Sequence, residues 1–336
     1  MHMKTKVTVV VSVYNVERFL PRCLDALVGQ TLKNIKIICV DDGSTDNSKK
    51  ILRDYLKKDK RIILITKKNE GLSSARNAGL KRCDTKYVMF CDGDDFYSPK
   101  MCEIMLRAIE ESGSDVAACG INVIYEAHSE MRKSDEAYYR LKYSGKNNIS
   151  DKLMLRTDVS VLDKIFRVDT IKKNQILFPL GLNNEDYYFY NAYMSVSKTA
   201  FYVEEKLYNY VRRQGSIMSE NFEAENKSMD HLKVAEELFW FYERTNFLIG
   251  HKNLFWKQWT MSVWFSVTHS SEKYKNEIIG EARSFARENY DKWRPDMVGV
   301  RADVMYIMTD GIVLKGVLKI YSLFSRICRH FSKNGI

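Results

Sequence analysis

The sequence predicts an α/β protein with a mainly parallel sheet and a helical appendage at its C-terminal end. Over the first 120 residues, short apolar runs rich in β-branched residues alternate with segments of helical periodicity. This alternation is typical of a parallel sheet that is covered by helices on both faces. From about residue 225 the pattern becomes helical and rich in aromatic residues, which indicates helices packed against the sheet domain.

Five strands and four helices are expected in the first 120 residues. The strands are expected at 7–13, 35–41, 61–66, 86–92 and 115–120, and the helices at 17–30, 46–58, 71–82 and 98–112. The middle of the chain is less regular, with one strand-like piece in FYVEEKLYNYV. We therefore expect two halves of one α/β domain, 1–120 and 121–222, followed by a helical region, 223–336.

The composition indicates a reducing compartment. The chain has 336 residues, of which 45% are hydrophobic, so it can form one large domain with an appendage or two domains. Its seven cysteines lie mostly in apolar runs and form no C-x-x-C pair, which argues against a zinc site or a disulfide framework. No apolar run approaches about 18 residues, and the N-terminal run is too short for a signal peptide. We expect a cytoplasmic protein.

The net charge of +10 favours an anionic partner, and part of that charge is concentrated near the C-terminus. Residues 315–333 predict a basic amphipathic helix, with apolar residues at three- and four-residue spacings and no acidic residue after Asp310. Such a helix can lie on an anionic membrane, here the inner face of the plasma membrane. The alternative is that its apolar stripe packs on the protein itself, and both interpretations stay open.

Three of the predicted strands end in polar residues. Tyr14 and Asn15 follow the first strand, Asp41 and Asp42 end and follow the second, and the string DGDD (92–95) follows the fourth. The carboxyl ends of parallel strands meet at one edge of a sheet, where ligands bind. Clustered carboxylates there suit Mn²⁺ or Mg²⁺ bound together with a diphosphate, although Asp and Gly are also ordinary turn residues.

Two loops near these strand ends combine structural and binding signals. In VDDGSTDNS (40–48), Asp46 or Ser44 is expected to cap the next helix, which leaves the two preceding aspartates to bind a base or a sugar. In NEGLSSARNAGL (69–80), small residues begin a helix that carries Arg76, a combination that suits phosphate oxygens. Neither the dinucleotide fingerprint nor the P-loop is present, which argues against NAD enzymes and P-loop NTPases.

Four ordered motifs within the first 96 residues resemble the N-terminal half of family 2 glycosyltransferases of the GT-A fold. They are SVYNVERFLPRCLDALVGQT, VDDGSTDNS, NEGLSSARNAGL and FCDGDDF. The segments VLDKIFRVDTI, FPLGLNNEDYYFYNAYM and LYNYVRRQGSIM resemble the acceptor side of the family and extend the similarity to about residue 220. The resemblance implies an inverting, metal-dependent transferase. Because the Q-x-x-R-W motif of the processive members is missing, we expect it to move a single hexose.

The resemblance also implies roles for individual residues. The expected nucleotide-binding residues are Val13, Tyr14, Asn15, Glu17, Asp41, Asp42, Asn69, Gly71, Arg76, Asp92, Gly93 and Asp94. Of these, Asp94 and Asp92 are expected to bind Mn²⁺ or Mg²⁺, with Asp92 nearer the ribose. The expected substrate-binding residues are Asp95, Lys164, Glu185, Arg212 and Arg213. For the two arginines, a solvated loop pair is the alternative interpretation.

Asp186 is the expected general base. Transfer from a nucleotide sugar needs a base for the proton of the acceptor hydroxyl and a cation for the departing diphosphate. Because the carboxylates at 92–95 are assigned to the cation, a separate carboxylate must take the proton. Glu185 and Asp186 match the E-D pair of the family and precede the aromatic segment YYFYNAYM. Without the resemblance, the alternative is that residues 184–186 merely cap that helix.

Two further functions stay open on the sequence alone. A nucleotidyltransferase shares the α/β crevice and the metal, but it would usually bring a Gly-rich basic loop to the first strand, which SVYNVERF lacks. A nucleic-acid-binding protein would cluster its basic residues with aromatic ones, whereas here they are dispersed except at the tail. We therefore expect a nucleotide-sugar donor, probed first as a UDP-sugar, and no nucleic-acid partner. The acceptor is expected to be a saccharide of cell-surface polysaccharide synthesis, lipid-linked if the tail binds a membrane.

Overall fold

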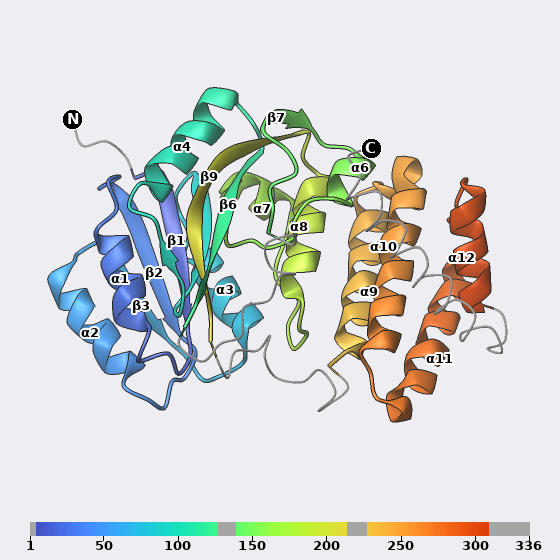
Figure 1. Cartoon of the computed structure of the whole chain (residues 1–336), viewed down its shortest axis with the longest axis horizontal. Helices are drawn as coiled ribbons and strands as arrows, with labels where there is room; N and C mark the ends of the chain where they lie inside the picture. Colours follow the sequence, from blue (N-terminus) through green and yellow to red (C-terminus); the bar gives the residue numbers. More distant parts are fainter. Residues whose placement is uncertain (1–4, 127–138, 214–226, 309–336) are drawn as a thin grey trace.

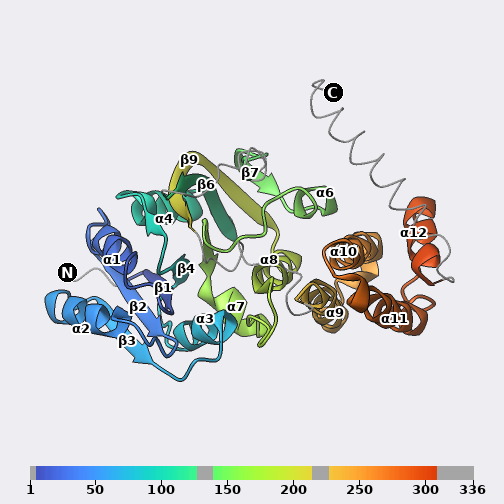
Figure 2. The same cartoon turned by 60° about the horizontal axis from the view of Figure 1, so that its bottom comes forward.

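The computed structural model describes residues 5–126, 139–213 and 227–308 of the chain. Within them lie one mixed sheet with helices on both faces and, beside it, a group of C-terminal helices (Figure 1). Helix α8 (Glu185–Ser195) stands between these two parts in both views (Figures 1 and 2). The predicted fold class, an α/β core with a helical appendage, is confirmed.

The N-terminal half of the sheet is parallel, as predicted. In spatial order its strands are β3 (Ile62–Thr66), β2 (Ile35–Asp41), β1 (Val7–Val13) and β4 (Tyr87–Asp92). The helices that connect them are α1 (Leu20–Val28), α2 (Ser48–Lys58) and α3 (Leu72–Lys81). The chain reverses direction across the sheet between β3 and β4. Right-handed crossovers therefore place α1 and α2 on one face and α3 on the other.

Helix α3 packs unusually close to β1, and Gly79 makes this possible. A Cβ atom at Gly79 would lie 2.3 Å from Cγ1 of Val10, which is a steric clash. The glycine therefore allows the helix that carries Arg76 to lie directly on the central strand. The position of Arg76 relative to the sheet edge follows from this contact.

The second half of the sheet is mixed rather than parallel. Its strands are β5 (Phe96–Tyr97), β6 (Val116–Tyr125), β7 (Gly145–Asn148), β8 (Lys164–Arg167) and β9 (Thr199–Arg212). Strand β8 lies between β4 and β6 and is antiparallel to both. The alternating pattern predicted β6 as a further parallel strand, but a short strand from later in the chain separates it from β4. Because β6 crosses residue 120, the two expected halves share one continuous sheet.

Helices α4 (Met101–Ser112), α6 (Asp151–Met154) and α7 (Val168–Asn174) complete the core together with α8. Helix α4 contacts β6 and β9, whereas α3, α7 and α8 lie on the opposite face (Figure 2). The Phe189 ring of α8 stacks on Phe178 at 4.2 Å and meets Phe90 of β4 at 5.6 Å, centroid to centroid. This aromatic cluster holds the beginning of α8 against the end of β4.

The appendage consists of α9 (Met229–Arg244), α10 (Leu248–Thr268), α11 (Glu272–Asn289) and α12 (Val298–Met308). Gln258 of α10 donates a hydrogen bond to the buried Asn191 of α8 at 2.8 Å, which ties the appendage to the core. Among the described residues, none of the helices has the length and apolar character needed to cross a membrane. The basic segment 315–333 lies outside the described residues, so its contact with a membrane stays a prediction.

Candidate active site

The loops that follow β1 and β2 are locked together by hydrogen bonds. Oδ1 of Asn15 accepts a hydrogen bond from the backbone N–H of Thr45 at 2.8 Å, and the Glu17 carboxylate accepts one from Asn47 at 2.7 Å. Asn15 and Glu17, both predicted to contact the nucleotide, thus shape the loops of this edge. The Tyr14 side chain beside them is 47% exposed, which suits stacking on a base.

Asp42, which directly follows β2, links this strand to the loop between β3 and α3 through hydrogen bonds. Its buried carboxylate accepts hydrogen bonds from Nζ of Lys67 at 2.7 Å and from the N–H of Gly71 at 2.8 Å. Its own N–H donates to the carbonyl of Val13, and the side chain of Asn69 accepts a weaker bond from Gly71. Val13, Asp42, Asn69 and Gly71, all predicted to bind the nucleotide, form one connected wall of the crevice together with Lys67.

Asp41 differs from Asp42 because one of its carboxylate oxygens is unused. Oδ1 accepts the N–H of Ser44 at 3.0 Å, whereas Oδ2 is buried without a hydrogen-bond partner among the described residues. A buried acceptor without a donor is unfavourable by roughly 1–3 kcal/mol, so this oxygen is suited to accept an N–H or O–H of a ligand. Asp46 accepts the N–H of Ser48, the first residue of α2, which agrees with its expected capping role.

Arg76 joins the two carboxylate groups that the sequence placed about ninety residues apart. Its guanidinium is 2% exposed and donates to Glu185 at 2.7 Å and to Asp186 at 2.5 Å through Nη1. Nη2 donates to Asp92 at 3.1 Å, and the Phe178 ring lies 5.2 Å from the guanidinium carbon. The end of β4 and the beginning of α8 therefore meet at one side chain. Arg76 was predicted to contact the diphosphate; in this structure it organises the surrounding acids.

Glu185 and Asp186, two of the carboxylates that contact Arg76, have raised pKa values. Burial raises the pKa of Glu185 to about 7, with a further increase from Asp186 and a decrease from Arg76. Burial also raises the pKa of Asp186, Arg76 lowers it, and the Asp92 charge raises it further. A carboxylate with a raised pKa is better matched to taking up a proton than an ordinary aspartate. The direction of the pKa shift of Asp186 therefore suits a general base.

Asp94 of the DGDD string lies close to the C-terminal end of β9. Its carboxylate accepts a hydrogen bond from Nε of Arg213 at 2.9 Å. Burial and the nearby Asp92 raise the pKa of Asp94, and Arg213 lowers it. A Cβ atom at Gly93 would lie 3.0 Å from Val16, so the glycine keeps the turn close to the loop after β1. Arg213 thus reaches the predicted metal-binding carboxylate.

Asp95 fixes the sheet in this structure through hydrogen bonds with β9. Its side chain is 1% exposed, and its carboxylate accepts hydrogen bonds from the Tyr208 hydroxyl at 2.5 Å and the Val211 N–H at 2.7 Å. Both partners belong to β9, so Asp95 joins the DGDD turn to that strand. Its predicted contact with the donor sugar has no support in this geometry, because both oxygens already accept hydrogen bonds.

The loop before α8 is held by the appendage. Asn183 donates from its backbone and its side chain to Asp230 of α9 at 3.0 and 2.6 Å. Asn184, which adopts a left-handed backbone conformation with φ of 66°, lies 3.0 Å from Nδ1 of His231. Burial lowers the pKa of His231 to about 4, so Nδ1 can accept from the Asn184 amide. Helix α9 therefore fixes the two residues that directly precede Glu185 and Asp186.

Two other predicted residues lie apart from the carboxylates around Arg76. Nζ of the buried Lys164 donates to Asp163 at 2.7 Å and to the carbonyl of Ser160 at 2.6 Å. Arg212 lies over the Tyr210 ring at 5.5 Å, near the end of β9. Their contacts with substrate stay predictions.

The residues that sequence reasoning missed come from other elements and carry no local motif. They are Lys67 beside Asp42, Tyr208 beside Asp95, Asp230 and His231 behind α8, and Asp158 near the Asp186 loop. Each is an ordinary polar residue in its own segment. Only the tertiary fold brings them to the site.

The described residues contain no group of three or more acidic, histidine or cysteine side chains arranged to hold a metal. The carboxylate oxygens of Asp92 and Asp94 are the kind of donor that a hard divalent cation prefers, and burial together with the nearby Asp92 charge raises the pKa of Asp94. A cation bound by one or two carboxylates completes its coordination with substrate phosphates and water. Metal binding by Asp92 and Asp94 stays a prediction.

The fold resembles that of nucleotide-sugar-binding proteins of known structure. The chain superimposes on crystal structures of S. aureus TarS 1-349 in complex with UDP, with a TM-score of 0.64 and 18% identity over 90% of this chain and 89% of that one. A second structure of that protein, in complex with UDP-GlcNAc, gives a TM-score of 0.59. These similarities identify the fold as GT-A.

Sequence comparison then identifies the family. The sequence profile described as Glycosyl transferase family 2 matches residues 8–169. The cholesterol galactosyltransferase of Borreliella burgdorferi is 30% identical over 244 residues, which cover 70% of this chain and 68% of that protein. The chain belongs to glycosyltransferase family 2.

A further relative is a much longer protein than the segment that it shares with this chain. Glycosyltransferase GlyA of Streptococcus pneumoniae is 33% identical over 219 residues, which cover 63% of this chain but only 31% of that protein. The chain thus matches about a third of this relative.

Proposed function

We propose that the chain is an inverting, metal-dependent glycosyltransferase that moves one hexose from a UDP-sugar to a hydroxyl of a saccharide. The single observation that carries this proposal is the Arg76 side chain, which brings Asp92 of the DGDD string and Asp186 to one guanidinium. Family membership and the likeness to a UDP-bound GT-A structure support the class of reaction and of donor. They favour it over the nucleotidyltransferase and nucleic-acid-binding alternatives.

The proposed division of labour follows from the geometry. Asp41, Asp42 and the loop at Tyr14 would hold the base and ribose. The unused carboxylate oxygen of Asp41 would accept a hydrogen bond from an N–H or O–H of the nucleotide. Asp186 would take the proton of the acceptor hydroxyl. A divalent cation held by Asp94 and Asp92 would supply positive charge for the leaving diphosphate. The saccharide acceptor, its attachment to a lipid and the contact of 315–333 with a membrane stay predictions.

A donor screen tests the proposed function. The purified chain is incubated with UDP-, GDP- and dTDP-hexoses, with and without Mn²⁺, and release of the nucleoside diphosphate is measured. We expect release from at least one UDP-hexose and stimulation by Mn²⁺. The absence of both nucleotide release and UDP binding would overturn the proposal.

An Asp94→Asn variant is expected to lose the stimulation by Mn²⁺. The amide keeps the size and one hydrogen-bond acceptor for Arg213, but it removes the negative charge that would bind the cation. We expect release of the nucleotide to fall by about 100-fold, a typical effect of a few kcal/mol of lost charge stabilisation. Asp291→Asn, an exposed aspartate of the appendage, is the control and should keep the response to Mn²⁺. An unchanged Mn²⁺ response in Asp94→Asn would remove Asp94 as a ligand.

The activity is expected to rise with pH along an acid limb and then level off. A base must be ionised to accept a proton, so activity is lost as pH falls through its raised pKa. Since Glu185, with a pKa raised to about 7, lies next to Asp186, its negative charge disfavours ionisation of the base. Glu185→Gln should therefore move the acid limb to lower pH, measured as kcat against pH. The exposed Glu272→Gln should leave it in place, and a limb that does not move would exclude this coupling.

A further inference from the structure

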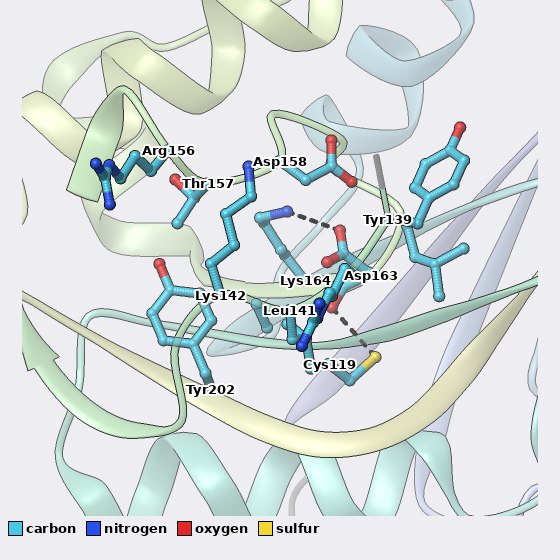
Figure 3. A pocket seen from close by; sticks show the side chains of 13 residues that line it. Cys119, Tyr139, Leu141, Lys142, Arg156, Thr157, Asp158, Asp163, Lys164 and Tyr202 are labelled. Atoms are coloured by element: carbon cyan, nitrogen blue, oxygen red, sulfur yellow. Dashed lines mark hydrogen bonds and ion pairs between the residues drawn. The ribbon is translucent and has the colours of Figure 1, made fainter. Parts of the chain in front are cut away.

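A second, smaller site lies beside the loop that leads into β8 (Figure 3). It is a cavity of about 20 Å³, which has room for about one water-sized group. Its lining comes from β6, β9, residues 139–142 and the loop 156–158. Of the residues predicted to bind substrate, Lys164 lines this cavity.

The rim of this cavity is positively charged. Lys164 is neutralised by Asp163, to which it donates at 2.7 Å. Arg140, Lys142 and Arg156 line the cavity as well, are exposed, and form no ion pair with any described residue. Figure 3 shows Lys142 and Lys164 extending in the same direction, toward the loop that carries Asp158. Three cations without acidic partners suit an anionic group at the mouth of the cavity.

The wall of the cavity also offers one unused hydrogen-bond acceptor. Oδ1 of Asp158 accepts the N–H of Ser160 at 3.1 Å, but Oδ2 is buried without a hydrogen-bond partner among the described residues. Such an oxygen gains a hydrogen bond if a ligand hydroxyl enters the cavity. Tyr202, which is part of the same lining, is buried.

The same loop touches the proposed base. The N–H of Val161, three residues after Asp158, donates to Oδ2 of Asp186 at 3.2 Å. The loop 158–161 therefore connects the cavity to the proposed base, although Asp186 itself does not line the cavity.

We infer that this cavity is an acceptor subsite for a sugar unit that carries an anionic group, either a phosphate or a carboxylate. One hydroxyl of that unit enters the cavity and donates to Asp158, and the anionic group is bound at the mouth of the cavity by Lys142 and the neighbouring arginines. The inference rests on the proposed function, because it names the chemical class of its acceptor.

The test is saturation-transfer NMR on the full chain with glucose 6-phosphate, glucuronate and glucose as probes, each titrated at millimolar concentration. We expect both charged sugars to bind more tightly than glucose, and the tighter of the two identifies the anionic group. Lys142→Glu should weaken both charged sugars about tenfold, the effect of losing one charge-assisted hydrogen bond. Lys152→Glu, a nearby exposed lysine outside the cavity lining, is the matched control and should leave binding unchanged.

A second variant and a second probe separate the possible failures. Asp158→Asn should weaken all three sugars, including glucose, because the hydroxyl contact is common to them. Equal binding of glucose and the charged sugars, or charged-sugar binding that Lys142→Glu leaves unchanged, would overturn the inference. Binding of UDP is recorded in parallel. If UDP binds normally while the charged sugars fail, the subsite is wrong and the proposed function stands; if UDP does not bind at all, the proposed function fails first.

Discussion

Asp186→Asn is expected to reduce glycosyl transfer by about 10²- to 10⁴-fold, the range that general bases contribute. Asparagine keeps the shape of the side chain and one oxygen for Val161 or Arg76, but it cannot take up the proton of the acceptor hydroxyl. Binding of UDP should survive, because the nucleotide is proposed to contact the loops after β1, β2 and β3 instead. The measurements are the rate of transfer with saturating donor and the dissociation constant for UDP.

The same variant distinguishes a base from a helix cap. Asp186 is the second residue of α8, where a negative charge stabilises a helix by about 0.3–1 kcal/mol. A capping role alone would give a slightly lower stability and an unchanged rate. Asp169→Asn serves as the control, because Asp169 occupies the first turn of α7 and is exposed. Equal rates for the wild type and Asp186→Asn would exclude Asp186 as the base.

The N-terminal part of the fold was predictable because it follows local rules. Each strand of the parallel half is an apolar run that ends at a polar loop, and the four predicted strands at 7–13, 35–41, 61–66 and 86–92 differ from β1, β2, β3 and β4 by at most one residue. The mixed half was not predictable in the same way. The four residues of β8 form too short a run to indicate their pairing, and their place between β4 and β6 depends on contacts far apart in sequence.

The candidate site was predictable as residue types at a sheet edge but not as a network of contacts. The sequence indicated two separate carboxylate groups, and the structure brings Asp92 and Asp186 to the same guanidinium. The structure also gives two adjacent aspartates different partners. Asp95 is buried against β9, whereas Asp94 accepts a hydrogen bond from Arg213. No local pattern distinguishes two neighbouring aspartates, because the difference lies in which residues of β9 and its C-terminal end each side chain contacts.

The appendage was predicted only as helices, yet it contributes to the site through the loop before α8. Asp230 and His231 of α9 hold Asn183 and Asn184, which directly precede the Glu185-Asp186 pair. A region without family motifs can therefore influence the base by fixing its loop.

Arg76→Met is expected to lower the free energy of unfolding by about 3–5 kcal/mol, the usual effect of removing one partner from a buried ion pair. The guanidinium is 2% exposed and is shared by three carboxylates, so its loss leaves Asp92, Glu185 and Asp186 without their common cation. Urea unfolding at pH 7 measures the change. Arg82→Met, at the exposed end of the same helix, should change stability by less than about 0.5 kcal/mol.

The pH dependence of that loss separates electrostatics from packing. Arg76 lowers the pKa of Glu185 and of Asp186, so in its absence both values rise above those of the wild type. The folded variant then binds protons more readily than the unfolded chain, and its stability recovers as pH falls through these raised values. Because the pKa of Glu185 is about 7 in the wild type and higher in the variant, the difference between the wild type and Arg76→Met should shrink as pH falls from about 9 to about 7. A difference that is the same at both pH values would mean that Arg76 acts through its contact with Phe178 and its volume, not through its charge.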